Sequence, residues 1–123
     1  MPPDDEQIAG GAGLLRRVHP DQVVEDGRGG HRPSSGVFRD PKMSVDVEPL
    51  LAQEGRDWHF TLRNTPEHSL VRFAAQVAFD HQQIIQHMPE VDNNAHAEVV
   101  GQKTGAIRNA FVDAAEWVLK KPR

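Results

Sequence analysis

The order of apolar and polar residues along the chain predicts a series of short β-strands. In residues 43–47, the side chains of Met43, Val45 and Val47 fall on one face of the extended chain, because successive side chains of a strand point to opposite sides. The same alternation, or a short apolar run bounded by proline or glycine, marks the other candidates. The predicted strands are residues 14–18, 43–47, 58–62, 70–79, 83–88 and 95–100.

The segment 70–79 fits two kinds of element. Its odd-numbered positions are apolar from Val71 to Phe79, which favours a strand. Alanine and glutamine, which fill several of its other positions, are good helix formers, and Phe73 and Val77 also follow helical spacing. We favour the strand, with a helix as the alternative.

Two segments have helical patterns. Residues 48–54 predict a two-turn helix, because a proline stands at its start and Gly55 follows its end. Near the C-terminus, apolar residues recur at steps of three and four, which predicts a long amphipathic helix that begins after the N-cap Thr104 and ends at Lys120-Lys121. Its apolar face is expected to contain Ile107, Ala110, Phe111, Ala114, Trp117 and Val118.

These elements predict an α+β fold, with a small, mostly antiparallel sheet packed by one long C-terminal helix. The 123 residues are enough for one hydrophobic core, so we expect a single domain over residues 14–121. Residues 1–13 are rich in proline, glycine and acidic side chains and offer little to bury. We therefore expect them to form a disordered leader.

Composition excludes several classes of protein. Only 37% of residues are hydrophobic, and no stretch approaches the roughly 20 apolar residues of a membrane-spanning helix. The net charge is −4, which argues against general nucleic-acid binding. Cysteine is absent, so no disulfide, thiolate metal site or cysteine nucleophile can form. The acidic N-terminus is unlike a secretory signal, and we expect a cytoplasmic protein.

Several short pieces of the sequence follow one another in a recognisable order: Arg16-Arg17, Arg32-Pro33-Ser34-Ser35 with Phe38, Met43-Ser44-Val45, and Asn94-Ala95-His96-Ala97. Together they resemble a group of short bacterial proteins of uncharacterised function, over roughly residues 14–118. The resemblance implies a bacterial, single-domain protein and implies no activity.

A glycine-rich stretch over residues 27–36 is the first candidate for chemistry. Backbone N–H groups of a glycine-rich loop can bind a phosphate, and Arg28, Arg32, Ser34 and Ser35 could complete such a site. The stretch does not match the P-loop pattern, and no helix is predicted to begin after it. A surface loop with solvated arginines is the simpler interpretation.

A second candidate is a site like that of ADP-ribosyltransferases. Small α+β folds of that type hold NAD with an early arginine, a serine and a late glutamate, roles open here to Arg17, to Ser34 or Ser35, and to Glu98. A small enzyme acting on a nucleotide or NAD-like ligand, with Arg32 as a further contact, is therefore our second hypothesis.

Histidines give a third candidate, a metal-dependent hydrolase. His81 and His87 would share a face of a strand, and His96 could join them from a neighbouring strand, with Asp80 or Asp92 as a carboxylate ligand. No H-E-x-x-H pattern is present, so histidines on a solvated sheet face are the simpler interpretation.

The hypothesis that requires the fewest assumptions is a non-catalytic protein-interaction module without a cofactor. Edge strands of a small sheet can pair with partners, and no candidate set of catalytic residues is specific. If Trp58 or Phe60 lies on an uncovered face of the sheet, a homodimer is expected.

Overall fold

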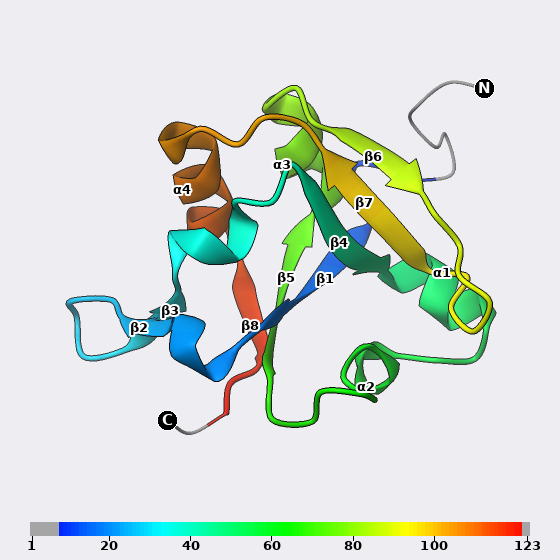
Figure 1. Ribbon diagram of the computed structural model, residues 1–123, viewed down its shortest axis with the longest axis horizontal. Coiled ribbons are helices and arrows are strands. Elements are labelled where there is room, and N and C mark those ends of the chain that lie inside the picture. The colour runs from blue at the N-terminus through cyan, green and yellow to red at the C-terminus, as the bar shows by residue number, and fades with distance from the viewer. Residues whose placement is uncertain (1–7, 122–123) are drawn as a thin grey trace.

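The strands form one antiparallel sheet with a separate hairpin beside it, in a computed structural model that describes residues 8–121 (Figure 1). The order across the sheet is β6-β7-β4-β1-β5-β8, and every neighbouring pair is antiparallel. The sheet strands are β1 (Gly13–Val18), β4 (Lys42–Val47), β5 (Ser69–Ala74), β6 (Ile84–His87), β7 (His96–Val100) and β8 (Glu116–Leu119). The hairpin consists of β2 (Val23–Glu25) and β3 (His31–Pro33).

Short helices connect the strands. In Figure 1, α4 and the 3₁₀ helix η2 lie at one side of the sheet, whereas α1 and α2 lie toward the other. The helical elements are η1 (Pro20–Gln22), η2 (Ser35–Phe38), α1 (Glu48–Gln53), α2 (Trp58–Thr61), α3 (Ala75–Asp80) and α4 (Gly105–Ala114). Among residues 8–121, no helix is long and apolar enough to cross a bilayer.

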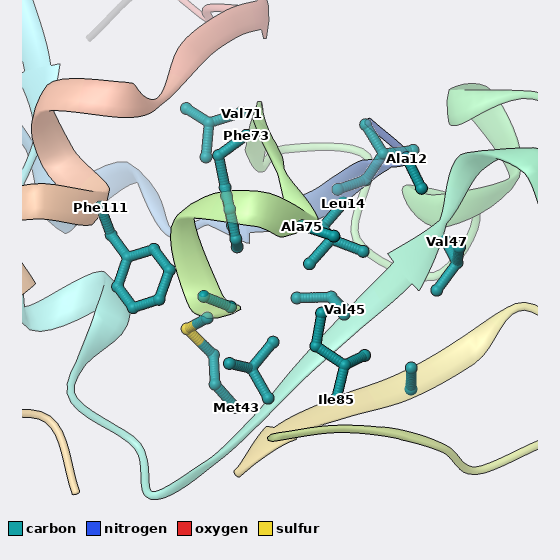
Figure 2. Packing of buried hydrophobic residues seen from close by; sticks show 14 of the residues in the cluster. Ala12, Leu14, Met43, Val45, Val47, Val71, Phe73, Ala75, Ile85 and Phe111 are labelled. Atoms are coloured by element: carbon teal, nitrogen blue, oxygen red, sulfur yellow. The ribbon is translucent and has the colours of Figure 1, made fainter. Parts of the chain in front are cut away.

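One side of the sheet, here called the apolar face, holds the core. Leu14 of β1 pairs with Val47 and Phe73 on its two neighbouring strands, and all three side chains are buried. Phe111 of α4 packs onto this face, with its ring centroid 5.0 Å from that of Phe73 and 5.6 Å from that of Phe38 in η2 (Figure 2). These three rings anchor α4 and η2 to the sheet.

The opposite side of the sheet, here called the polar face, has a different composition. Cross-strand partners point to the same side, so Leu15 of β1 shares this face with Asp46 and Arg72, and Asp46 shares it with His96. Arg72 makes a bidentate ion pair with Glu48 at the start of α1, with N–O distances of 2.5 and 2.6 Å. The polar face is therefore covered by charged contacts and by α1 and α2.

The α+β class and the antiparallel sheet are confirmed, but the long C-terminal helix is wrong. Thr104 is the N-cap as expected, since its hydroxyl accepts a hydrogen bond from Ile107 N. The helix ends at Ala114, and Trp117 and Val118 belong to β8, which pairs with β5. Pairing at the open edge of β5 overrides the helical periodicity of these residues.

The predicted strand over residues 58–62 is also wrong. Asp57 caps this segment as helix α2 by accepting a hydrogen bond from His59 N through its carboxylate. The apolar positions Trp58, Phe60 and Leu62 therefore do not form one face of a strand. Alternation over only five residues does not distinguish a strand from a short helix that begins at an aspartate N-cap.

Residues 70–79 contain both elements that the sequence left open. The strand β5 ends at Ala74 and α3 begins at Ala75. The first N–H groups of α3, at Ala75 and Gln76, donate to the carbonyl groups of Ala12 and Gly10. Tertiary contacts therefore determine where β5 ends and α3 begins. Carbonyl groups of the N-terminal segment accept the hydrogen bonds of the first N–H groups of the helix, which have no partner within the helix itself.

The expected leader, residues 1–13, lies partly outside the described residues. From Ile8 onward it is packed: Ile8 is 4% exposed and Ala12 is 8% exposed, and both belong to the core cluster. The predicted strands at 14–18, 43–47, 83–88 and 95–100 correspond to β1, β4, β6 and β7, and the helix at 48–54 corresponds to α1.

Candidate functional site

A polar cavity of about 280 Å³ lies on the polar face of the sheet, and we call it the Asp46 pocket. Its floor comes from β1, β4 and the start of β7. One wall is the end of α2 with the turn that follows, and the other is the loop 88–95 between β6 and β7. The lining residues that the argument uses are Arg17, Asp46, Thr61, Arg63, Asn93 and His96.

The carboxylate of Asp46 joins the floor to both walls. One oxygen accepts a hydrogen bond from the Thr61 hydroxyl at 2.7 Å, and the other accepts one from Asn93 Nδ2 at 2.8 Å. Asn93 Oδ1 in turn accepts a hydrogen bond from Ala95 N. Asp46 is 6% exposed and Asn93 is 3% exposed, so these bonds are nearly shielded from water and hold the pocket rigidly.

A second set of contacts ties the two walls together at the surface. Asp92 of the loop accepts a hydrogen bond from Arg63 Nη2 at 3.1 Å, and its backbone carbonyl accepts one from Arg56 Nη1 at 2.7 Å. The hydrogen bond from Arg63 holds the pKa of the Asp92 carboxyl below its usual value. Both guanidinium groups stack on the Phe60 ring, at 3.9 and 3.8 Å from its centroid.

His96 lies on the floor of the pocket opposite Asp46 in the strand pairing. Its Nδ1 lies 2.9 Å from the carbonyl oxygen of Met88, which can only accept a hydrogen bond. Nδ1 therefore carries a proton, and in the neutral ring Nε2 is an acceptor. This contact also joins the loop 88–95 to β7.

Arg17 is the one cation of the pocket that has no partner within residues 8–121. Its side chain is exposed and makes no hydrogen bond or ion pair with another described residue. The other arginine of the pocket, Arg63, is committed to Asp92 and to the Phe60 ring. Arg17 is therefore the group most available to an incoming anion.

The loop that forms one wall also carries exposed apolar side chains. Met88 is 44% exposed and Val91 is fully exposed, and they are the exposed large hydrophobic residues of the described chain. Both belong to the loop 88–95, which also supplies Glu90 and Asn93 to the pocket. The loop that forms this wall thus exposes apolar surface to water, which is unfavourable.

A carboxylate of the glycine-rich loop occupies two of the backbone donors that a phosphate would use. The N–H groups of Arg28 and Gly30 donate to one carboxylate oxygen of Asp26, at 2.7 and 3.1 Å. These backbone hydrogen bonds lower the pKa of Asp26. An anion from the same loop therefore occupies the position in which a phosphate was expected, and it would repel one. Only residues 27–30 of the predicted loop belong to the turn of the β2-β3 hairpin, because residues 31–33 form β3 and residue 35 begins η2.

The residues proposed for a nucleotide site do not meet in one cavity of the described structure. Ser34 is the N-cap of η2 and accepts a hydrogen bond from Gly36 N, and Ser35 follows it, on the side of the sheet where Phe38 packs. Arg32 is exposed on β3, where its side chain donates to the carbonyl of Pro33. Arg17 and Glu98 lie on the polar face.

The histidines proposed as metal ligands are bound to the backbone. His81 Nδ1 lies 2.8 Å from the Val77 carbonyl oxygen, His87 Nε2 lies 2.5 Å from that of Asn94, and His96 Nδ1 bonds Met88 as described above. In the part of the chain that the structure describes, no three histidine or acidic side chains are arranged to hold a metal ion.

Trp58 and Phe60, the basis for the expected homodimer, do not lie on a sheet face. Trp58 stacks on His59 with ring centroids 3.7 Å apart, and Phe60 lies between Arg56 and Arg63. Both are half-buried in or beside α2. Their apolar surface is used within the chain.

Two further cations, the half-buried Arg16 and the buried Lys103, lie outside the pocket and have structural roles. Arg16 donates to the carbonyl groups of Val37 and Ser44, and burial lowers its pKa. Lys103 is 7% exposed and donates to the carbonyl groups of Val99 and Gly101, and burial lowers its pKa to about 8. Both join loops to the sheet.

Sequence reasoning missed most of the pocket. The sequence pattern predicts Asp46 only as a polar position of a strand and indicates no role for Thr61, Arg63 or Asn93. An available signal was Asp46 itself, a carboxylate within an apolar strand next to Val45 and Val47. A charge in that setting needs hydrogen-bond donors, which Thr61 and Asn93 provide from distant parts of the chain.

Comparisons of the chain with protein-family models, with curated proteins and with solved structures found no match. The case for function therefore depends on the geometry of the molecule itself.

Proposed function

We propose that the protein is a non-catalytic interaction module that binds an extended segment of a partner protein in the Asp46 pocket. The observation that carries the proposal is the position of the exposed apolar side chains. Met88 and Val91 lie in the same loop that supplies Asn93 and Glu90 to the pocket. Apolar anchors beside a polar cavity are typical of surfaces that bind other proteins.

The rigidity of the pocket supports binding. The hydrogen bonds that Asp46 accepts from both walls, together with the contacts of Asp92 with two arginines, hold the cavity open before any partner arrives. A preformed cavity loses little conformational entropy when it is filled. The partner therefore meets a fixed arrangement of donors and acceptors.

The state of the polar groups supports a role without catalysis. Thr61 is 6% exposed and its hydroxyl already donates to Asp46, so a substrate cannot reach it readily. Both oxygens of Asp46 accept hydrogen bonds from neutral donors of the chain. A nucleophile and its base need access to a substrate, and this pair is closed inside the floor.

We propose a segment of another protein rather than a second copy of this chain. The rings that would have supported a dimer, Trp58 and Phe60, are stacked on neighbouring side chains of the same molecule. On this account the free protein stays monomeric, and light scattering at increasing concentration gives the mass of one chain, 13.7 kDa.

A display library of random peptides tests the proposal. Peptides are selected on the wild-type protein and then measured on two variants that place the same bulky side chain at exposed asparagines. Asn64→Trp fills the pocket from its wall, whereas Asn109→Trp lies on α4 away from it. We expect selected peptides to bind the Asn109→Trp variant as they bind the wild type and to lose binding to Asn64→Trp.

Two results would count against the proposal. One is a selection that yields no peptide with measurable affinity for the wild type. The other is a set of peptides that bind the Asn64→Trp variant as well as the wild type, which would locate the binding surface elsewhere. Circular dichroism of each variant checks that both remain folded.

A further inference from the structure

A group of basic side chains lies at one end of the Asp46 pocket. Arg17 pairs with Leu70 across β1 and β5, and the register continues with His19 and His68 just beyond the paired strands. The rings of His19 and His68 meet edge to face, with centroids 5.3 Å apart. The positive charge of Arg17 is close enough to act on His68. Arg17 therefore belongs both to the pocket and to this basic cluster.

We infer that Arg17, His19 and His68 form an anion subsite that takes the acidic side chain of the bound segment. The inference rests on the proposed function and adds the chemistry of the ligand: the segment carries a carboxylate or a phosphoryl group at the position that reaches Arg17. A guanidinium group and two imidazole rings are the usual donors to such groups.

The cluster has unused capacity for hydrogen bonds. Arg17 makes no hydrogen bond or ion pair with another described residue. The Nδ1 atom of His68 is buried and has no partner, which is unusual for a buried polar atom. An anion at this position would provide an acceptor for Arg17 and for Nε2 of His19, whose Nδ1 already accepts a hydrogen bond from Asp21 N, and it would favour a protonated His68.

Within residues 8–121, acidic side chains do not already fill the subsite. The nearest to His68 is Glu67, whose carboxylate lies 3.6 Å from Nε2, and the nearest to His19 is Asp21, at 3.7 Å from Nδ1. The side chains of Glu67 and Asp21 are 60% and 90% exposed, so both extend into solvent. Ion pairs at this exposure contribute little, and a bound anion can displace them.

The subsite predicts that binding takes up protons. Burial lowers the pKa of His68 below its usual value of 6.5, and Arg17 and His19 lower it further while Glu67 raises it. A bound anion would raise that pKa again, because it favours the charged ring. Affinity for an acidic segment should therefore rise as the pH falls from neutral toward the lowered pKa of His68.

Oriented peptide libraries provide the test. Three libraries share the same random flanks and differ at one central position, which is glutamate, glutamine or phosphoserine. Binding is measured on the wild-type protein, on Arg17→Gln, and on Arg28→Gln as the control, since Arg28 is an exposed arginine at the tip of the hairpin. Circular dichroism confirms that the variants fold.

We expect the glutamate and phosphoserine libraries to bind about tenfold or more tightly than the glutamine library, since hydrogen bonds to charged groups contribute most to affinity. Arg17→Gln should remove this preference, and Arg28→Gln should keep it. His68→Gln should reduce the dependence of affinity on pH. The tighter of the two acidic libraries identifies whether the partner uses a carboxylate or a phosphoryl group.

Failure of this inference differs from failure of the proposed function. If the glutamine library binds as tightly as the acidic libraries, and Arg17→Gln changes nothing, the anion subsite is refuted while binding in the pocket stands. If no library binds at all, the proposed function fails as well. Loss of acidic preference in Arg28→Gln alone would move the subsite to the hairpin and overturn the inference.

Discussion

The two faces of the sheet differ in the interactions that stabilise their buried side chains. On the apolar face, Phe38, Phe73 and Phe111 pack against one another with centroids 5.0 to 6.0 Å apart. On the polar face, Asp46 is almost as deeply buried but is held by hydrogen bonds from Thr61 and Asn93. Packing is non-directional and tolerates small adjustments, whereas hydrogen bonds require fixed positions.

This difference separates stability from binding. Contacts of the apolar face bury most of the core and connect helices to the sheet. Contacts of the polar face place a cavity, a free cation and exposed apolar side chains next to one another. Substitutions on the two faces should therefore separate the free energy of unfolding from the affinity for a partner.

The largest loss of stability is expected on the apolar face. Phe111→Ala removes a fully buried ring that contacts two others, and the free energy of unfolding should fall by about 3–5 kcal/mol. Phe60→Ala, the same change on the other side, removes a half-buried ring that packs at the margin of the core and stacks with two arginines, and it should cost only about 1–2 kcal/mol. Urea denaturation measures both. Equal losses would contradict the division between the faces.

A smaller but clear loss is expected at Asp46. Asp46→Ala leaves the Thr61 hydroxyl and the Asn93 amide without their acceptor, which should lower the free energy of unfolding by about 2–3 kcal/mol. Thr61→Val removes one of the two hydrogen bonds and should cost about 1 kcal/mol. If Asp46→Ala leaves the free energy of unfolding unchanged, the carboxylate does not stabilise the walls of the pocket.

A pH-dependent effect is expected at Lys103. Burial lowers its folded-state pKa to about 8, so between pH 8 and 10.5 the unfolded chain binds more protons than the folded one. The contribution of Lys103 to stability therefore rises with pH across this window. The wild type should therefore gain free energy of unfolding relative to Lys103→Met as the pH rises. A difference that stays constant would show that the amine is not desolvated.

The smallest effect on stability is expected at Arg17. Its exposed side chain has no partner among the described residues, so Arg17→Gln should change the free energy of unfolding by no more than about 0.5 kcal/mol. Thermal denaturation beside the wild type checks this value. A larger loss would mean that the guanidinium has a structural role, and the case for an anion subsite would weaken.

The sequence predicted the parts of the fold that depend on local pattern. Alternation identified β4, a short run that Gly101 stops identified β7, and the proline and glycine around residues 48–55 identified α1. The sequence did not predict the elements whose conformation depends on contacts with residues distant in the chain. Trp117 joins a strand because β5 offers an open edge, and α3 begins at Ala75 because carbonyl groups of residues 10–12 accept its first N–H groups.

The candidate site was harder to predict for the same reason. Arg17 and His96 were named from the sequence, but in separate hypotheses about a nucleotide and a metal. What brings them together is the strand order, which places β1, β4 and β7 side by side. Thr61 lies 15 residues after Asp46 in the sequence and Asn93 lies 47 residues after it, so the three side chains meet only in the folded state. Such pairings leave no periodic signal in the sequence.

The most direct test of the account is a titration of isotope-labelled protein with a selected acidic peptide, followed by NMR chemical shifts. The account predicts that shifts change at Arg17, at His96 and along the loop 88–95, and that α4 and the hairpin turn around Gly29 stay unaffected. Changes concentrated on α4 or on the hairpin, with none around Asp46, would contradict it.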